Sequence, residues 1–251
     1  MKRFQLLITA ILLVYSITAQ NVSINNDGST PHSSAMLEVK SSTKGFLPPR
    51  MTSSEIFSIS NPAEGLMVYN LNTNKPAFHN GSQWSYFDGT LMSPSVGDFI
   101  QGGVVFYVDG SGGGMVCAVS DQSTGAGWGC GGTGIPGADG TAIGTGAQNT
   151  ADIVAGCSTT GIAAYICDTL TLNGYTDWFL PSKDELNEMY TNRTTINTTA
   201  LANGGASFAG GKYWSSSEHS AANAWAHIFF NGFTNDFVKS EMNYVRAVRE
   251  F

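Results

Sequence analysis

The chain has 251 residues, of which 42% are hydrophobic, 11% are aromatic and only 12% are charged. This low charge, together with 30 glycines, argues against a helical bundle and favours a loop-rich, mainly β protein. The formal net charge of -7 leaves no basic footprint, so the composition excludes a typical nucleic-acid-binding protein.

The first twenty residues, MKRFQLLITAILLVYSITAQ, have the pattern of a secretory signal peptide. Lys2 and Arg3 form a basic start, residues 6–14 form a short apolar run, and small residues follow near Ala19. The run is too short to remain as a membrane span, and no second long apolar run occurs. We therefore expect a mature chain without a membrane span, secreted or held at the outer cell surface.

Export makes the four cysteines disulfide candidates, because disulfides persist in oxidising compartments. Cys117 lies in the apolar run GGMVCAV and is expected to be a buried free thiol. Cys130 is expected to pair with Cys157 or Cys167, and the sequence leaves that choice open. No CxxC spacing occurs, which argues against a zinc site.

Residues 21–92 are expected to form a β-rich stalk module with a linker. The segment GLMVYN, residues 65–70, predicts a strand, and Asn80-Gly81 between alternating apolar residues predicts a hairpin. A module of this size buries little core, so it needs a partner or an oligomer. The segment TLMSPSVGD, residues 90–98, is expected to be a linker.

Residues 93–251 are expected to form a second domain, the head. Strands are predicted at Val104–Val108 and Met115–Val119, joined by DGSGGG. A Gly-rich stretch over residues 121–150 then predicts a long loop that is either functional or pinned by cross-links.

Two helices are predicted next in the head. One covers GIAAYICDTL, residues 161–170. The other begins in LPSKDELNEMY, where Ser182 and Glu185 have the spacing of a capping box.

The C-terminal part of the head predicts further strands, in YWSSS, AWAHIFF, FTNDFVKS and NYVRAVREF, with a turn at Asn231-Gly232. Two helices among many strands indicate an α+β fold.

Several motifs that suggest enzyme chemistry lack the context that the chemistry needs. GTGIPG, residues 132–137, has no strand before it and no helix directly after it, as a dinucleotide site would require. A Cys130 nucleophile with His219 or His227 as its base would need a lowered thiol pKa, and nothing beside Cys130 predicts one.

A metal site is equally weakly supported. His219 and His227 with Glu218 and Asp236 do not give a full ligand set, so the histidines are interpreted as surface side chains available for contact. Calcium near Asp109, Asp121 or Asp139 would have no defined spacing. No cofactor is therefore expected.

Another set of side chains is expected to be structural. Tryptophans in strands are more often core than ligand contacts, and the two C-terminal arginines are expected to pair with buried acids or carbonyls. The set consists of Trp178, Trp214, Glu218, Trp225, Arg246 and Arg249.

Four separated motifs, GYTDWFLPSKDEL, YWSSSE, AWAHIFFNG and VRAVREF, resemble a family of bacterial exported domains that includes the C-terminal domains of collagen-like adhesins. The resemblance covers about residues 97–251. It implies a C-type-lectin-like fold with two helices, a mixed and mainly antiparallel sheet, and long loops. The N-terminal module is similar to stalk pieces of tail-fibre-like proteins, which implies a homotrimer.

Two enzymatic branches of the same superfold are disfavoured by missing residues. The formylglycine-generating enzymes use a late cysteine pair, and no cysteine follows Cys167. Related iron-dependent enzymes use a histidine cluster that this chain lacks. A non-catalytic protein is expected.

A third branch, the variable proteins of diversity-generating retroelements, has a similar C-terminal frame with variable positions between the frame residues. Those in-between positions are His219, Ser220, Ala221, Ala226, His227, Asn231, Phe233, Thr234, Asp236, Phe237 and Ser240. Their small, polar and aromatic side chains are the adaptable set found in binding loops.

The sequence therefore predicts a secreted or cell-surface, adhesin-like protein that recognises an extracellular glycan or protein through residues 219–240. Phe233 and Phe237 would supply stacking area, and polar neighbours would supply hydrogen bonds. The expected ligand-binding residues are His219, Ser220, Ala221, His227, Asn231, Phe233, Asn235, Asp236 and Phe237. The alternative is a structural fibre-tip or appendage subunit without a soluble ligand.

Overall fold

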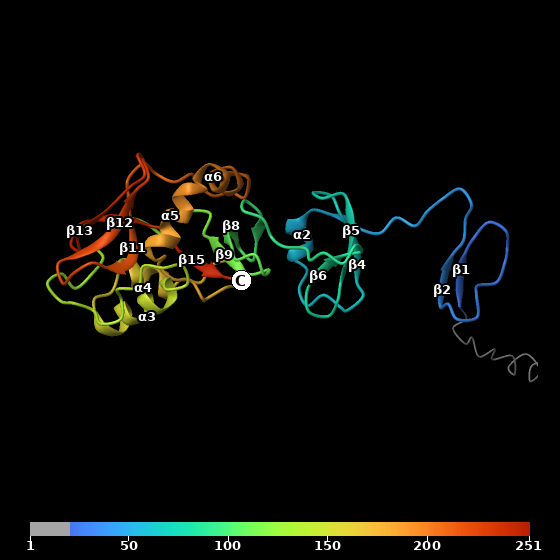
Figure 1. Cartoon of the computed structure of the whole chain (residues 1–251), viewed down its shortest axis with the longest axis horizontal. Coiled ribbons are helices and arrows are strands. Elements are labelled where there is room, and N and C mark those ends of the chain that lie inside the picture. Colours follow the sequence, from blue (N-terminus) through green and yellow to red (C-terminus); the bar gives the residue numbers. More distant parts are fainter. Residues whose placement is uncertain (1–20) are drawn as a thin grey trace, which may run out of the picture. The chain divides into compact units, whose positions relative to one another are not determined.

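The computed structural model describes residues 21–251 (Figure 1). The predicted signal peptide, residues 1–20, lies outside the described residues. The chain divides into two units, Met1–Pro48 and Pro49–Phe251. Within residues 21–251, no helix is both long and apolar enough to span a membrane.

The described part of the first unit contains a small parallel sheet. Strand β1 (Val22–Ile24) pairs with β2 (Leu37–Val39), so that Val22 lies beside Leu37 and Ile24 beside Val39. The polar segment between the two strands returns the chain to the start of the sheet.

The second unit begins with a small β module whose core is formed by six buried side chains. The strand order is β3-β4-β5-β6, with one short helix, α2. The bounds are β3 (Arg50–Met51), α2 (Ser53–Phe57), β4 (Met67–Asn70), β5 (Lys75–His79) and β6 (Trp84–Tyr86). The core residues are Ile56, Val68, Ala77, Trp84, Tyr86 and Met92.

Two predictions from the sequence can be compared with the structure of this module. The hairpin around Asn80-Gly81 is confirmed, because β5 and β6 pair across it. The predicted linker was placed too early: Met92 is buried, and its N–H donates to Trp84 O at 3.0 Å. The apolar Met92 completes the core of the module, so it cannot lie in an exposed connection.

The head contains two sheets. A four-stranded sheet has the order β15-β9-β8-β7, and a five-stranded sheet has the order β10-β14-β11-β12-β13. The strands of the first sheet are β7 (Phe99–Ile100), β8 (Gly103–Val108), β9 (Gly114–Cys117) and β15 (Val248–Glu250). Those of the second are β10 (Ser123–Ala126), β11 (Lys212–Glu218), β12 (Asn223–Ile228), β13 (Phe233–Val238) and β14 (Asn243–Val245).

The last predicted strand, residues 243–251, is split between these sheets. β14 joins one sheet and β15 the other, with Arg246 and Ala247 between them. Arg246 Nε donates to Asp121 Oδ1 at 2.8 Å, and Ala247 N donates to Gln122 Oε1 at 2.6 Å. These side-chain hydrogen bonds take the place of strand-to-strand hydrogen bonds where the chain passes from one sheet to the other.

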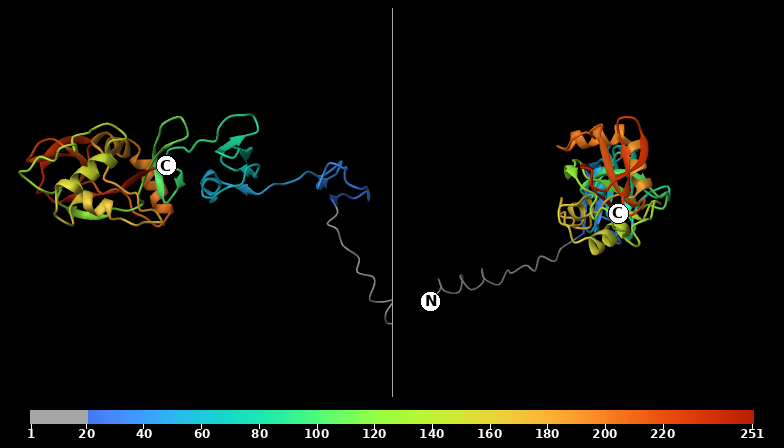
Figure 2. Two further views of the ribbon diagram at one scale, coloured as in Figure 1. Left: turned by 90° about the horizontal axis from the view of Figure 1, so that it is seen from below. Right: turned by 90° about the vertical axis from the view of Figure 1, so that its left-hand side faces the viewer.

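The head has more helices than the two that the sequence predicts. They are α3 (Gly146–Gly156), α4 (Ala163–Asp168), α5 (Lys183–Thr191) and α6 (Arg193–Ala202). Helices α4 and α5 are the predicted ones, and the Ser182–Glu185 capping box is present. Helices α3 and α6 were not predicted, and α3 with β10 shortens the predicted long loop. Figure 2 shows α3 and α4 together beside the strands.

Strand β11 lies between two hydrophobic clusters of the head. Tyr213 belongs to a cluster that includes Phe106, Met189 and Phe229. Trp214, the next residue, points to the opposite face and belongs to the other cluster. The mainly antiparallel sheets with few helices confirm the predicted α+β class.

Candidate functional site

The candidate site is the hairpin formed by β12 and β13. Strand β13 is the edge of its sheet and pairs along its length with β12, from Asn223 opposite Val238 to Ile228 opposite Phe233. Opposite residues share a face, so the hairpin presents two faces and a tip.

One face of the hairpin packs against α5. The Tyr190 ring of α5 lies 4.5 Å from the His227 ring and 5.6 Å from the Phe229 ring, between centroids. The Arg193 guanidinium also lies over the Tyr190 ring, 4.0 Å from its centroid. These contacts attach the hairpin to the helix.

His227 is therefore a correction to the sequence prediction, which places it among the displayed side chains. It is 1% exposed. Its Nδ1 lies 2.9 Å from Thr234 Oγ1, and its Nε2 has no partner among the described residues. Burial lowers the pKa of His227 to about 4, so the ring is neutral at physiological pH.

The opposite face carries Phe233, Asn235 and Phe237 on the edge strand. Phe233 is exposed, whereas Phe237 is half-buried under the Lys212 ammonium, which lies 3.9 Å from its ring centroid. The two phenylalanines are four residues apart, about 13 Å along the strand. They cannot stack on one small ligand together. Ala226, expected among the variable positions, is buried on this face beside Trp214.

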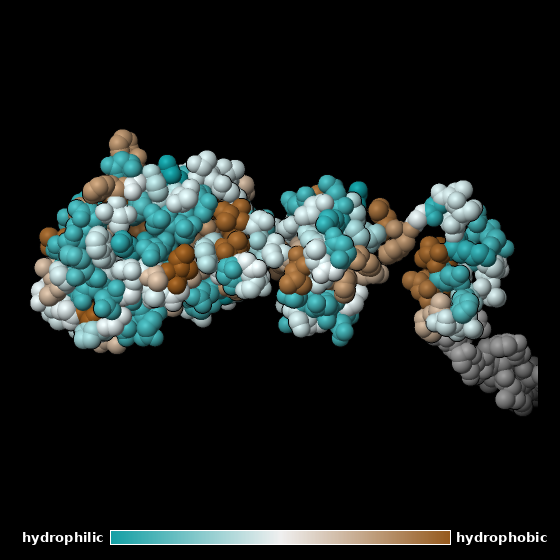
Figure 3. Space-filling view, in the orientation of Figure 1, coloured by the Kyte–Doolittle hydropathy of each residue, from teal (hydrophilic) through white to brown (hydrophobic). Residues whose placement is uncertain are grey.

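The tip of the hairpin is apolar and projects from the head (Figure 1), where the surface view shows hydrophobic atoms (Figure 3). Phe230 is 83% exposed and Phe233 is 59% exposed, with the exposed Asn231 between them. Gly232 has φ +79°, and a Cβ there would collide with Tyr190. The sequence did not single out Phe230, because the apolar residues Ile228, Phe229 and Phe230 follow one another without a sign of where the strand ends.

The base of the hairpin carries a polar cluster around Trp225. Asp236 accepts from Asn223 Nδ2 at 2.6 Å and lies 3.3 Å from His219 Nδ1. The Asn223 hydrogen bond lowers the pKa of Asp236. Lys183 lies 4.4 Å from the Trp225 ring, and His219 contacts the edge of that ring.

Trp225 was predicted to be buried and is half-buried instead, with the Lys183 side chain of α5 over its ring. Asn223 and Lys183 join this cluster without having been predicted. Lys183 lies forty residues away in sequence, and no local pattern connects it to the hairpin. Ser220 and Ala221 are exposed at the adjoining turn.

The Gly-rich loop is pinned beneath this end of the hairpin. The buried Lys239 ammonium pairs with Glu218, donates to Thr133 O at 2.8 Å and lies 4.4 Å from the Trp128 ring. Glu218 also accepts from Ile135 N at 3.0 Å. Glu218 thus has a structural position.

The disulfide adds a covalent tie, since Cys130 pairs with Cys157. Cys117 is a buried free thiol, as expected, and Cys167 is buried and free as well. Burial raises the pKa of Cys117 to about 12 and also raises the pKa of Cys167. Neither thiol is poised as a nucleophile.

The hydroxyl groups of the serine triplet of β11 all make hydrogen bonds within the head. Ser215 Oγ donates to Trp225 O at 2.9 Å, Ser217 Oγ donates to Gly140 O at 2.6 Å, and Ser216 Oγ accepts from Asn149 at 3.2 Å. None of the three hydroxyls faces a basic side chain that would activate it.

The remaining framework side chains are buried. Trp178 and Trp214 are each at most 2% exposed, and Trp214 Nε1 donates to Ala126 O at 2.8 Å. Arg246 pairs with Asp121, and Arg249 makes two 2.8 Å bonds to Asp177.

The loop acids considered for calcium are used in different ways. Asp121 accepts from Arg246 and Tyr213, and Asp109 accepts from Ser111 N at 2.7 Å within its own turn. Asp139 is exposed. Within residues 21–251, no group of three or more His, Cys, Asp or Glu side chains converges as a metal site would require.

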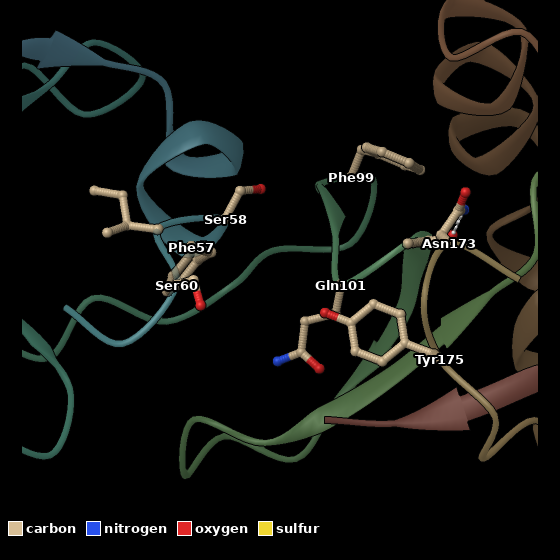
Figure 4. Close-up of a pocket in the computed structure, with 9 residues that line it drawn as sticks. Phe57, Ser58, Ser60, Phe99, Gln101, Asn173 and Tyr175 are labelled. Atoms are coloured by element: carbon tan, nitrogen blue, oxygen red, sulfur yellow. Dashed lines mark hydrogen bonds between the residues drawn. The ribbon is translucent and has the colours of Figure 1, made fainter.

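A separate pocket of about 600 Å³ lies away from the hairpin (Figure 4). Phe57 lies at the end of α2, and Phe99, Gln101 and Tyr175 line the other side. Asn173 donates to Gly102 O at 2.7 Å. The pocket offers aromatic and amide groups but no carboxylate, histidine or thiol among its lining residues.

The geometry defines a mixed α+β head with a disulfide-tied loop and a projecting edge hairpin. Residues 117–249 match the family model of the Lcl C-terminal domain. Because the match spans more than half of the chain, the protein belongs to this family, which confirms the resemblance found in the four motifs. Residues 23–98 match a phage tail-like trimerisation region.

Two wider comparisons add less. A fimbrial protein from Bacteroides ovatus ATCC 8483 is similar in structure, with a TM-score of 0.45 and 14% sequence identity. The match covers 76% of this chain and 63% of that chain, so it spans less than two thirds of the fimbrial protein. The comparison with curated proteins found no match.

Proposed function

We propose that the protein is a secreted or cell-surface, adhesin-like binding protein, without catalytic activity, whose head recognises an extracellular glycan or protein through the β12–β13 hairpin. The signal-peptide pattern supports export, and the order of the four sequence motifs supports a C-type-lectin-like fold for the head. The trimerisation match supports a homotrimer.

The observation that carries the proposal is the exposed tip of the hairpin. Phe230 and Phe233 are large apolar side chains held in solvent by a turn that is fixed to α5 through Tyr190. Exposed aromatics on a rigid support lose little entropy on binding. Two large exposed apolar side chains at a projecting tip support an interaction site there.

The polar cluster at the base gives the hairpin a second kind of contact. Trp225 offers part of a ring, while Asp236 and His219 offer an acceptor and a donor beside it. A ring flanked by polar groups suits a sugar, whereas the apolar tip suits a protein surface. Substitutions at the base should therefore affect a glycan ligand, and substitutions at the tip should affect a protein ligand.

The test is to screen the full chain, without its predicted signal peptide, on glycan and protein arrays and to measure the affinity of each hit. Phe230→Ala with Phe233→Ala should weaken a protein hit at least tenfold, and Trp225→Ala should do so for a glycan hit. Leu201→Ala is the matched control, because Leu201 is also an exposed apolar side chain, 58% accessible, on α6. Unchanged affinity in both hairpin variants would contradict the proposal.

The exposure of the in-between side chains also bears on the resemblance to variable proteins of diversity-generating retroelements. Of the in-between positions, Ala226 and His227 are buried, so variation that changes a ligand would have to act at the exposed ones, such as Ser220 and Asn231. The test is the neighbouring DNA: a near-copy of the codons for residues 213–251 that differs only at adenines would support this origin.

The second candidate is an appendage subunit whose head packs on other subunits. The match to a phage tail-like trimerisation region is the observation that favours it. Stable trimers without any hit on either array would favour this candidate over a binding protein.

A further inference from the structure

In the β1–β2 sheet the apolar face is exposed and the polar face is the more covered one, the opposite of the usual arrangement in a small sheet. The pairs Val22–Leu37 and Ile24–Val39 share one face, and Ser23–Glu38 occupies the other. The four apolar side chains are 53%, 58%, 59% and 41% exposed for Val22, Leu37, Ile24 and Val39. The central polar pair is less exposed than these neighbours.

The segment between the strands explains the reversal, because it bonds to the polar face. Asn25 Nδ2 donates to Ser23 Oγ at 2.6 Å, and His32 N donates to Glu38 Oε2 at 2.6 Å. The loop therefore satisfies the polar side chains and, within this unit, leaves the four apolar side chains largely exposed. Figure 3 shows this hydrophobic patch over β1 and β2.

A parallel sheet of this size needs other residues packed on its apolar face to be stable. Each strand has three residues, and an isolated two-stranded sheet is at best marginally stable in water. The pairing is parallel, and parallel sheets occur almost only where both faces are covered. The neighbouring charges do not oppose contact, because Glu38 lies on the opposite face, and Asp27 and Lys40 pair within one copy at 2.8 Å.

We infer that the face of Val22, Ile24, Leu37 and Val39 is covered by the same face of two other copies of this chain, around a threefold axis. Both strands lie in the segment that matches a trimerisation region, except for Val22 directly before it. Three identical apolar faces can converge on a threefold axis, where one side of each face contacts the other side of the next copy's face and the ring closes. This inference rests on the homotrimer in the proposed function and adds which residues form its contact.

The first test measures the mass of the full chain, without its predicted signal peptide, by sedimentation velocity over a range of concentrations. The wild type should have three times the monomer mass. Ile24→Asp with Leu37→Asp should raise the concentration needed for trimers at least about tenfold, since each substitution puts a charge on an apolar contact in all three copies. Thr30→Asp with Ser33→Asp, at exposed polar loop positions, is the control and should leave the trimer intact.

A second measurement does not depend on destabilising the sheet. In an Ile24→Cys variant, oxidation should link copies covalently because the same residue of each copy lies near the axis. A Ser33→Cys variant should give no such link. Trimers that persist in the aspartate variant, with no link through Ile24→Cys, would overturn the inference alone. A wild type that stays monomeric would overturn the trimer as well, while array binding by the head would stand or fall separately.

Discussion

His227 is a buried imidazole that must stay neutral. Its Nε2 has no partner among the described residues, and the surrounding groups are the Tyr190 and Phe229 rings, with Arg193 nearby. Burial is the main cause of its lowered pKa, and the Arg193 charge adds to it. The residue that the sequence offered as a ligand contact is instead part of what holds the hairpin to α5.

The buried ring predicts a pH dependence of stability. Its pKa falls from an ordinary 6.5 to about 4 on folding, so the unfolded chain binds more protons between these values. The His227 contribution should therefore be complete above pH 6.5 and be lost progressively as the pH falls towards 4. Urea unfolding of the wild type and of His227→Gln at pH 4.5 and 7.5 measures it.

The expected result is a smaller loss of stability at pH 4.5 in His227→Gln than in the wild type. Ser220→Gln is the control, because Ser220 is exposed at the turn adjoining the hairpin and has no titratable side chain, so this variant should lose as much stability as the wild type. Equal losses in the wild type and His227→Gln would show that His227 is not the group responsible.

At the scale of elements, the edge strand β13 is anchored at its end by Lys239. This side chain is buried against Trp128 and pairs with Glu218, so it ties β13, β11 and the Gly-rich loop together. Breaking a buried pair by removing one partner leaves the other charge uncompensated. The matched surface pair is Lys212–Glu241, at 2.7 Å and about one third exposed on each side.

Lys239→Met should lower the free energy of unfolding by about 3–5 kcal/mol, as for other broken buried pairs. Lys212→Met should lower it by less than about 1 kcal/mol, because exposed pairs contribute little. Chemical denaturation of both variants makes the comparison. Similar small losses in the two variants would contradict an anchoring role for Lys239.

The disulfide is the second tie on the same loop, joining Cys130 to Cys157 across a sequence separation of 27. A loop of this length predicts that Cys130→Ser with Cys157→Ser lowers the free energy of unfolding by about 3–4 kcal/mol. Thermal unfolding of the double variant checks this prediction. A loss below 1 kcal/mol would indicate that the noncovalent contacts of the loop suffice.

The helices show what the sequence could predict at this scale. Helix α5 was predictable because Ser182 and Glu185 cap it by a local rule. Helix α6, RTTINTTALA, has four threonines and no side-chain cap, and it is held by burying Ile196 and Ala200 in the core. Helix α3 begins inside the Gly-rich stretch, also without a side-chain cap. Tertiary packing, which is not visible in a local pattern, decides both.

The candidate site also has a part that the sequence could predict and a part that it could not. Alternation along β12 and β13 allowed both strands and the turn between them to be predicted, with Phe233 and Asp236 on the second strand. The ligand contacts expected of these two residues stay predictions. Alternation does not say which face meets α5, so His227 was assigned to solvent and Lys183 was missed. Phe230 lies where the strand gives way to the turn, a boundary that an apolar run does not mark.

At the scale of the whole molecule, the proposed trimer would carry three hairpins on one assembly. Weak contacts at each tip would then combine, because the second and third contacts of one assembly form at a high effective concentration. The Ile24→Asp with Leu37→Asp variant should consequently bind an array hit on a dense surface less tightly than the wild type. Its affinity for the same target in free, monovalent form should be unchanged.

The most direct test of the central claim, that the head binds through its edge hairpin, is hydrogen exchange of the full chain with and without a target from the array screen. The account predicts slower amide exchange in residues 219–240 on binding. It predicts no change around Phe57 and Tyr175, which line the separate pocket. Protection at that pocket, with unchanged exchange in the hairpin, would contradict the claim.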